Sequence, residues 1–482
     1  MRPTLPARRA SLRRLATLGS GLGAAWLPPS WVRAQTAQTD PTAPTAQATQ
    51  MAAPVLQPLL QQRLAYEGVA LAAAHIAPQQ AGPDFGFAAA RSSAPDADTL
   101  FELGSITKTF TALLLADAVL RGEVKLDDAV EAVLPQGLKL RDSQGQPLRW
   151  RDLATHRSGL PRLPGNLHDA GGPDPYARYG WAEMQLFLQG WQARQPRDTA
   201  YAYSNLGYGL LGQALGLRAG LDYPSLLSQR VLQPLGLAGQ IGLAAGPGQR
   251  LLSGHDPEGR PVPHWHFQPA MAGAGALLGS ARGLARYAQA ALGLMDHPLQ
   301  AAFTLCLQPH GQGPNPRNPV GLAWGLAPLF DRTVFNHDGA TAGFSSSLWL
   351  DPSRRRASLV LANAQVGVGD LALHVLEPQV PLKNMALTRQ TAQAQTAEAL
   401  APLAGVYALN PQFKLRVRAE GERLFAQASG QGEFELFAKQ AAGARRFFAR
   451  VTPLELEFEG LAGQAPSLTL YQGANTLRFV RE

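Results

Sequence analysis

Residues 101–112 read Phe-Glu-Leu-Gly-Ser-Ile-Thr-Lys-Thr-Phe-Thr-Ala, and they place Ser105 and Lys108 three positions apart at the start of a predicted helix. Side chains at i and i+3 of a helix share a face, so the Lys108 amine can hydrogen-bond the Ser105 hydroxyl. A serine hydroxyl is a weak nucleophile unless a base removes its proton. A lysine buried beside other polar groups can have a pKa low enough to act as that base. The pair therefore indicates acyl transfer through a covalent ester on Ser105.

Two further motifs follow this pair along the chain. The first is Tyr203-Ser204-Asn205, directly before a predicted helix over 206–219, and the second is His337-Asp338-Gly339 at the end of a predicted strand. A lone S-x-x-K pattern arises by chance in a chain of 482 residues, and alone Asn205 would be interpreted as a helix cap. The presence of all three motifs in this order makes the prediction of a catalytic site much more specific than any one motif does.

Together, the S-x-x-K, Y-x-N and H-x-G motifs resemble those of the class C β-lactamase family of serine hydrolases, which also contains D-alanyl-D-alanine carboxypeptidases, D-amino-acid peptidases and esterases. The resemblance covers about residues 64–378. It implies an α/β fold of the β-lactamase/transpeptidase type, in which helices flank an antiparallel sheet and a mainly helical subdomain completes the cleft. No cofactor is expected.

The resemblance implies a role for each motif residue. Ser105 would be the nucleophile, and Lys108 and Tyr203 would exchange protons with it and with the leaving group. Asn205 would donate a hydrogen bond to the acyl-amide carbonyl of the substrate and help to fix Lys108.

The third motif would complete the site. The backbone N–H groups of Ser105 and Ala340 would form the oxyanion hole, the first of them at a helix start. Gly339 would let a substrate pack closely along the strand edge.

His337 departs from the family pattern, because β-lactamases and typical carboxypeptidases have the lysine of K-T-G at this position. That lysine is a permanent cation that can hold a carboxylate, whereas histidine has an ordinary pKa near 6.5 and is largely neutral at pH 7. We therefore expect weaker, pH-sensitive carboxylate binding at His337. Efficient β-lactam hydrolysis is not expected, although acylation by β-lactams stays open.

The charge of the chain argues against a nucleic-acid partner. The formal charge is +8, from 43 basic and 35 acidic residues. Six arginines and no acid lie within 1–34, which leaves 37 basic residues against 35 acidic ones in the rest. A balanced body of this kind offers no basic surface for nucleic acid.

The first 34 residues predict a signal peptide. Arginine pairs at 8–9 and 13–14 precede an apolar run over 15–27, and Val32-Arg33-Ala34 fits a small-x-small cleavage site. Both the Sec and the twin-arginine routes fit these features. The apolar run is too short to span a bilayer, so we favour cleavage over an uncleaved anchor. We expect a periplasmic or secreted protein with no stable membrane span after cleavage.

The spacing of hydrophobic residues divides the rest of the chain into predicted linkers and domains. Residues 35–53 predict a disordered linker, and 54–380 predict the hydrolase domain, whose last part is an antiparallel meander of strands. A second linker covers 381–397. Short strands at regular spacing over 398–482 predict a small antiparallel β-barrel, which resembles the lipocalin-like domain often appended in this family and which we interpret as a structural or docking module.

Four residues receive structural interpretations. Cys306 is the only cysteine, so the chain cannot form an internal disulfide, and we expect it in the core. His156 lies in a turn-like segment and is expected to be structural. His264 and His266 share one face of an extended segment, but no third ligand accompanies them, so no metal site is predicted.

The sequence thus predicts an exported serine hydrolase that forms an acyl-enzyme on Ser105. Its expected substrates are small molecules or peptides with amide or ester bonds, above all peptides that contain D-amino acids, such as peptidoglycan fragments, and β-lactam-like compounds. One alternative is a carboxylesterase that acts on short acyl esters. An alternative of another class is a non-catalytic peptidoglycan-binding sensor.

Overall fold

The computed structural model describes residues 55–64, 69–90, 93–167, 174–256, 259–315, 318–383, 390, 392–410, 413–429, 433–439, 445–460, 463–472 and 475–482. The predicted signal peptide (1–34) and the first predicted linker (35–53) lie outside these residues. Within the described ranges, no helix has both the length and the apolar character that crossing a lipid bilayer requires.

An antiparallel sheet of eight strands, in the order β2-β1-β13-β12-β11-β10-β9-β8, forms the centre of the first 380 residues. The meander predicted from the sequence is present as β11, β12 and β13, each paired with the next. The bounds are β1 Ala70–Ile76, β2 Asp84–Ala89, β8 Gly311–Asn315, β9 Asn318–Val320, β10 Gly325–Leu329, β11 Arg332–Ala340, β12 Ser345–Asp351 and β13 Arg356–Ala362.

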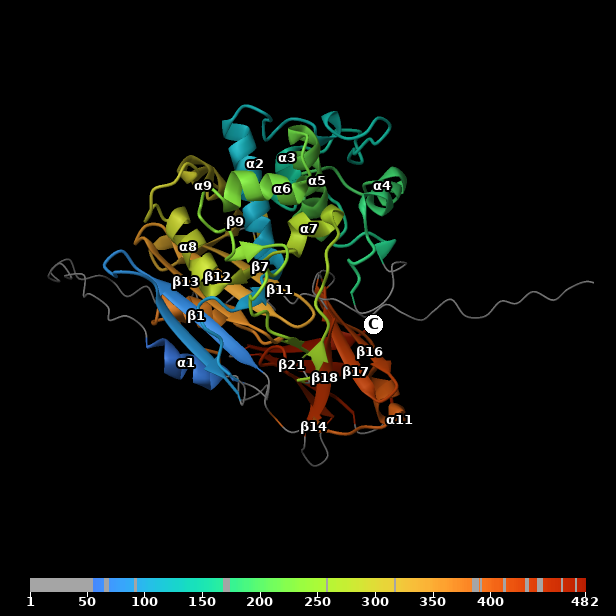
Figure 1. Cartoon of the computed structure of the whole chain (residues 1–482). Helices are drawn as coiled ribbons and strands as arrows, with labels where there is room; N and C mark the ends of the chain where they lie inside the picture. Colours follow the sequence, from blue (N-terminus) through green and yellow to red (C-terminus); the bar gives the residue numbers. More distant parts are fainter. Residues whose placement is uncertain are drawn as a thin grey trace, which may run out of the picture.

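Helices cover both faces of this sheet (Figure 1). α1 (Leu56–Arg63) and α10 (Gly369–Leu376) pack on one face, and α8 (Ala281–Ala291) packs on the other. Every residue of β1 is buried for this reason. A strand that is covered on both sides is apolar throughout instead of alternating, and β1 reads Ala-Leu-Ala-Ala-Ala-His-Ile.

A helical subdomain lies beside the sheet and contains α2 at its centre (Figure 1). α2 is apolar on nearly all sides and its residues 107–118 are buried, as expected for a helix surrounded by others. It ends just before Gly122, which has a positive φ of 71°. The other helices here are α3 Trp150–Ala154, α4 Trp181–Gly190, α5 Asn205–Ala219, α6 Tyr223–Leu227, α7 Pro269–Gly275 and α9 Gln300–Cys306. Short pairings join β3 (Leu100–Glu102), β7 (Leu278–Ser280) and β4 (Ile241–Gly242).

The C-terminal part is a closed, antiparallel barrel in which β15 to β22 pair in chain order and β22 returns to β15 (Figure 1). Buried apolar side chains, among them Leu415, Leu456 and Phe479, fill its interior as a second core. The bounds are β15 Gly405–Asn410, β16 Phe413–Glu420, β17 Arg423–Ala428, β18 Glu433–Lys439, β19 Arg446–Ala449, β20 Glu455–Phe458, β21 Ser467–Gln472 and β22 Asn475–Arg481.

The predicted fold class, a β-lactamase-like body with a small C-terminal barrel, is confirmed. One difference concerns the second predicted linker, 381–397. Within it β14 (Ala392–Gln393) pairs with β18 of the barrel, and α11 (Ala397–Leu400) begins before the predicted barrel does. Thr396 caps this helix by accepting a hydrogen bond from the Ala399 N–H.

Candidate active site

Ser105 lies in the single 3₁₀ turn Gly104–Ile106, which continues directly into α2. Lys108 stands in the first turn of α2 and is 0% exposed. Its Nζ lies 3.0 Å from Ser105 Oγ, so the shared helix face predicted from the sequence does bring amine and hydroxyl together.

The Lys108 amine has two other acceptors. Nζ donates to Asn205 Oδ1 at 2.8 Å and to the Ala274 carbonyl oxygen, at the end of α7, at 2.6 Å. Burial, helped by the positive charge of Arg162, lowers the pKa of Lys108 well below its ordinary value of 10.5. A neutral amine has two N–H donors and one lone pair. In that neutral form, with Asn205 and Ala274 accepting the two N–H groups, the lone pair would face Ser105 Oγ and could take its proton.

Tyr203 reaches the same hydroxyl from the other side of the cleft. A hydrogen bond joins its side chain to Ser105, and its ring centroid lies 4.9 Å from Lys108 Nζ. Burial raises the pKa of Tyr203 to about 12, although Arg162 and the bond to Ser105 oppose the shift. The phenol therefore keeps its proton at neutral pH, and the lysine is the basic member of the pair.

Ser204 and Asn205, which follow Tyr203, have different roles, and the sequence alone did not decide which of them caps the helix. Ser204, not Asn205, caps α5, because its Oγ accepts the Gly207 N–H at 2.8 Å. Asn205 is the first residue of the helix, and its side chain is thereby free to face Lys108. The cap fixes the helix start from which Asn205 projects.

His156 contacts the segment that carries Tyr203 and fixes its position. Its Nδ1 accepts the Ser204 N–H at 3.0 Å, and its ring centroid lies 4.2 Å from that of Tyr203. Its carbonyl oxygen accepts the Ala202 N–H at 2.7 Å. Burial and the nearby cations lower the pKa of His156, so the ring stays neutral and packs as an aromatic plate. The role is structural, as the sequence predicts.

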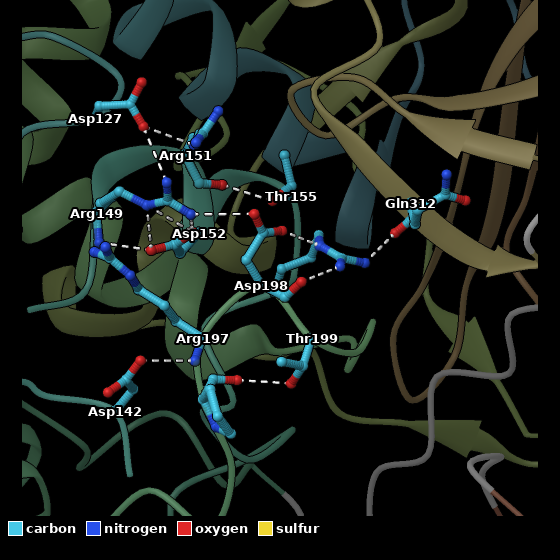
Figure 2. A network of polar contacts seen from close by, with 12 residues as sticks. Asp127, Asp142, Arg149, Arg151, Asp152, Thr155, Arg197, Asp198, Thr199 and Gln312 are labelled. Carbon is cyan, nitrogen blue, oxygen red and sulfur yellow. Dashed lines mark hydrogen bonds and ion pairs between the residues drawn. The ribbon is translucent and has the colours of Figure 1, made fainter. Parts of the chain in front are cut away.

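A network of arginines and aspartates anchors the loop that leads to Tyr203 (Figure 2). Arg149 contacts Asp127 at 3.1 Å, Asp152 at 2.7 Å and Asp198 at 3.2 Å. Asp198 also pairs with Arg157, whose guanidinium donates to the Gln312 carbonyl oxygen of β8 at 2.8 Å. The network thus ties the loop to α3 and to the last strand of the sheet.

The third motif lies on an open strand edge. β10 pairs with β11 only as far as Asn336, so residues 337–340 pair with β12 alone. Gly104 has a φ of +51°, and a Cβ there would lie 2.7 Å from the Ala340 nitrogen. A Cβ at Gly339 would overlap the Leu103 carbonyl. These two glycines let the Ser105 turn approach the open edge, which brings the backbone of Ser105 close to that of Ala340.

His337 is neutral and presents an acceptor. Burial, together with the charge of Lys108, lowers the pKa of His337 to about 3. Its Nδ1 lies 2.7 Å from the Asp338 carbonyl oxygen, which can only accept, so Nδ1 carries the proton. In a neutral ring Nε2 then carries no hydrogen, and its lone pair can accept a hydrogen bond. His337 can receive a hydrogen bond from a substrate but offers no cation to a carboxylate.

One cleft of about 1170 Å³ is lined by Ser105, His156, Tyr203, Asn205 and residues 336–340. Several of its other lining residues were not identified from the sequence, because no motif marks them: Arg162, Tyr176 and Trp265 from loops, and Lys414 and Arg416 from β16 of the barrel. The guanidinium carbon of Arg162 lies 5.1 Å from the centroid of the Tyr203 ring, a contact between separate loops that no sequence motif signals. The two histidines flanking Trp265 contact carboxylates: His264 contacts Glu102 at 2.7 Å and His266 contacts Asp174 at 2.8 Å.

The sequence profile of the Beta-lactamase family matches residues 56–376, which is more than half of the chain. The chain belongs to the Beta-lactamase family. This Beta-lactamase family protein is 34% identical over 141 residues to a beta-lactamase of Escherichia coli (strain K12), which covers 29% of this chain and 34% of the relative. It is 30% identical over 146 residues to the D-alanyl-D-alanine-carboxypeptidase/endopeptidase AmpH of the same strain, covering 30% and 37%. The matched stretches thus span about a third of these relatives' length.

A longer match is found with penicillin-binding protein 4 of Amycolatopsis lactamdurans, 28% identical over 335 residues, or 64% of this chain and 84% of the relative. Solved structures show the same fold. A beta-lactamase/D-alanine carboxypeptidase of Yersinia pestis has a TM-score of 0.55 at 24% identity, covering 64% of this chain and 89% of that chain. A class C beta-lactamase has a TM-score of 0.57 at 22% identity, covering 67% and 92%.

Proposed function

We propose that this protein is an exported serine hydrolase that forms an acyl-enzyme on Ser105. The observation that carries the proposal is the environment of Lys108: a fully buried amine that lies 3.0 Å from a serine hydroxyl and also contacts Asn205 Oδ1 and the Ala274 carbonyl oxygen. Membership of the Beta-lactamase family supports it. The arginine-rich start of the chain supports export.

In the proposed reaction, Lys108 Nζ takes the proton of Ser105 Oγ as the oxygen attacks the carbonyl carbon of the substrate. The negative charge that develops on the carbonyl oxygen faces the N–H groups of Ser105 and Ala340. The proton then passes from Lys108, through the Tyr203 hydroxyl, to the departing nitrogen or oxygen as its bond to carbon breaks. Water, deprotonated by the same groups, hydrolyses the ester and restores Ser105.

Amides of D-amino-acid-containing peptides, peptidoglycan fragments among them, and β-lactam-like compounds are the substrates we propose. The support is the name of a relative, a D-alanyl-D-alanine-carboxypeptidase/endopeptidase that is 30% identical over the matched stretch. One observation favours a second candidate, a carboxylesterase. His337 is neutral, so the strand edge offers no cation for the terminal carboxylate of a peptide.

The test is the full chain with Ser105→Ala, compared with Ser93→Ala, which removes a hydroxyl from an exposed serine outside the cleft. Turnover of p-nitrophenyl acetate and covalent labelling by a fluorophosphonate and a fluorescent penicillin are measured. Both activities should disappear in Ser105→Ala and persist in Ser93→Ala. Turnover that survives in Ser105→Ala would overturn the assignment.

A substrate panel then separates the candidates. Faster cleavage of D-alanyl-D-alanine peptides than of short acyl esters supports the peptidase, and the reverse order supports the esterase. If the wild-type chain binds isolated cell wall but never forms a serine adduct, the non-catalytic sensor is the correct function.

A further inference from the structure

One wall of the cleft is made by the C-terminal barrel. The outer surface of β16 and β17 contributes Lys414, Arg416, Gln427 and Ser429 to the same space that Ser105 lines. The barrel also touches the body near the sheet, where a Cβ added at Gly367 would lie 3.5 Å from the Val451 carbonyl oxygen. The barrel is therefore part of the site and more than an appended module.

Strand register explains why two cations face the cleft. Leu415 and Val417 of β16 are buried in the barrel core, so the alternating positions Lys414 and Arg416 point outward. Arg416 pairs in register with Gln427 of β17. The result is a polar, positively charged strip on the outside of the barrel, formed by side chains that alternate along regular strands.

The two cations differ in how far carboxylates neutralise them. Lys414 pairs with Glu482 at 2.6 Å, and both side chains are partly exposed. Arg416 is exposed and has no carboxylate partner among the residues that the structure describes. Arg162 adds a third cation, and the acidic residue of the lining is Asp338, whose pKa burial raises. Arg416 therefore leaves positive charge on the barrel side of the cleft, which would attract an anion.

The positive charge that lines the cleft thus lies away from His337. The strand edge, at His337, carries no cation, whereas the barrel wall carries two. On the proposed function of this cleft, we propose that β16 of the barrel forms an anion subsite, in which Lys414 and Arg416 bind a carboxylate that the substrate carries at a distance from its scissile bond. The large volume of about 1170 Å³ gives such an extended substrate room to reach from Ser105 to the barrel.

Substrate pairs that differ by one carboxylate test the subsite in the full chain. Mono-p-nitrophenyl glutarate and p-nitrophenyl butyrate differ on the acyl side, and 4-acetoxybenzoate and phenyl acetate differ on the leaving-group side. The variant is Lys414→Gln/Arg416→Gln. The matched control is Arg423→Gln/Arg478→Gln, which removes the same charge from exposed barrel positions that do not line the cleft.

For at least one pair, the ratio of kcat/KM for the anionic over the neutral substrate should fall about 5- to 30-fold in Lys414→Gln/Arg416→Gln, mainly through KM. The neutral substrates, and the control variant, should stay within about twofold. Raising the salt concentration should lower the ratio in the wild type and leave it flat in the variant. Unchanged ratios in both pairs would overturn the subsite.

A measurement without turnover separates this proposal from the proposed function. Calorimetric titration of glutarate into Ser105→Ala should show binding that Lys414→Gln/Arg416→Gln weakens at least about fivefold and that the control keeps. Equal glutarate binding in all three backgrounds overturns the subsite even if the enzyme is active. Loss of glutarate binding supports it even if no substrate in the panel is cleaved.

Discussion

The two side chains that contact the Ser105 hydroxyl are shifted in opposite directions by the same cause. Burial lowers the pKa of the Lys108 amine and raises that of the Tyr203 phenol to about 12. Desolvation disfavours the charged form of each group, so the amine gives up its proton more readily, and the phenol holds its proton more tightly, than either would in water. A neutral amine is a base and a neutral phenol is an acid, which assigns the two proton-transfer directions of the proposed mechanism.

Lys108→Met keeps the bulk of the side chain and removes this base. We expect kcat/KM for p-nitrophenyl acetate to fall about 10²- to 10⁴-fold. In the wild type, log kcat/KM should rise with pH until Lys108 has lost its proton, at a pH well below 10.5, and this limb should be missing in the variant. The exposed Lys125→Met serves as the control. An intact limb in Lys108→Met would show that another group titrates.

His337→Lys places a cation on the strand edge. The ratio of acylation by a fluorescent penicillin, which has a carboxylate, to hydrolysis of neutral p-nitrophenyl acetate should rise about tenfold, equivalent to about 1.4 kcal/mol. Neutral His337→Gln should not raise it. Because the pKa of His337 is about 3, the wild-type ratio should show no histidine titration between pH 5 and 8. A rise in the glutamine variant would mean that size, not charge, limits penicillin binding.

How much of the site could be read from sequence depends on whether a residue's partner is local. Ser105 and Lys108 are brought together by one helix turn, so their spacing was sufficient. The roles of Ser204 and Asn205 required the structure, because either side chain can cap a helix. Arg162 and His156 act through contacts to Tyr203 across separate loops, and no short motif records such contacts.

Among the local elements, the turn before α2 is the most constrained. Gly104 combines a positive φ of 51° with a Cβ position 2.7 Å from the Ala340 nitrogen. Gly122, at the other end of α2, has a φ of 71° but open space around its Cβ. The two glycines therefore separate the effect of backbone strain from the effect of a collision with the strand edge.

Gly104→Ala should lower kcat at least about tenfold and lower Tm more than Gly122→Ala does. Gly122→Ala should carry only the left-handed backbone strain, about 1 kcal/mol, with kcat unchanged. Ester turnover and thermal unfolding of both variants measure this. Equal kcat in the two variants would show that the spacing of Ser105 and Ala340 tolerates displacement.

Elements with a clear period were predictable and those without one were not. The antiparallel meander expected in the last part of the hydrolase domain occurs as β11, β12 and β13. β14 has two residues, too few to show alternation, and its sequence Ala-Gln is typical of a linker. Only pairing with β18 makes it a strand.

At the scale of the whole molecule, the apolar residues gather in separate cores for body and barrel. Leu211 is buried in the first and Leu456 in the second. Leu211→Ala and Leu456→Ala should each cost about 2–5 kcal/mol. Differential scanning calorimetry should show two transitions, of which each variant lowers a different one. A single transition lowered equally by both would mean that the cleft interface couples the two cores.

The barrel itself was predictable, but its place on the body was not. Regularly spaced short strands predict a barrel because each strand has its own alternation of apolar and polar residues. Docking, in contrast, brings the outward residues Lys414 and Arg416 against a cleft whose nearest motif along the chain, His337-Asp338-Gly339, is about 75 residues away. In the sequence of the barrel, outward-facing polar residues look like ordinary solvent-exposed positions. Their place in the cleft is visible only when the barrel and the body are seen together.

Lys108 also links the stability of the protein to acidity. When the chain unfolds, water returns to the amine and its pKa moves back toward 10.5. Between the lowered pKa of the folded state and that value, the unfolded chain binds one proton more than the folded chain. The contribution of this group to the free energy of unfolding therefore grows as the solution becomes alkaline and shrinks as it becomes acidic. The side chain that would activate the serine is thus also one that weakens the fold in acid.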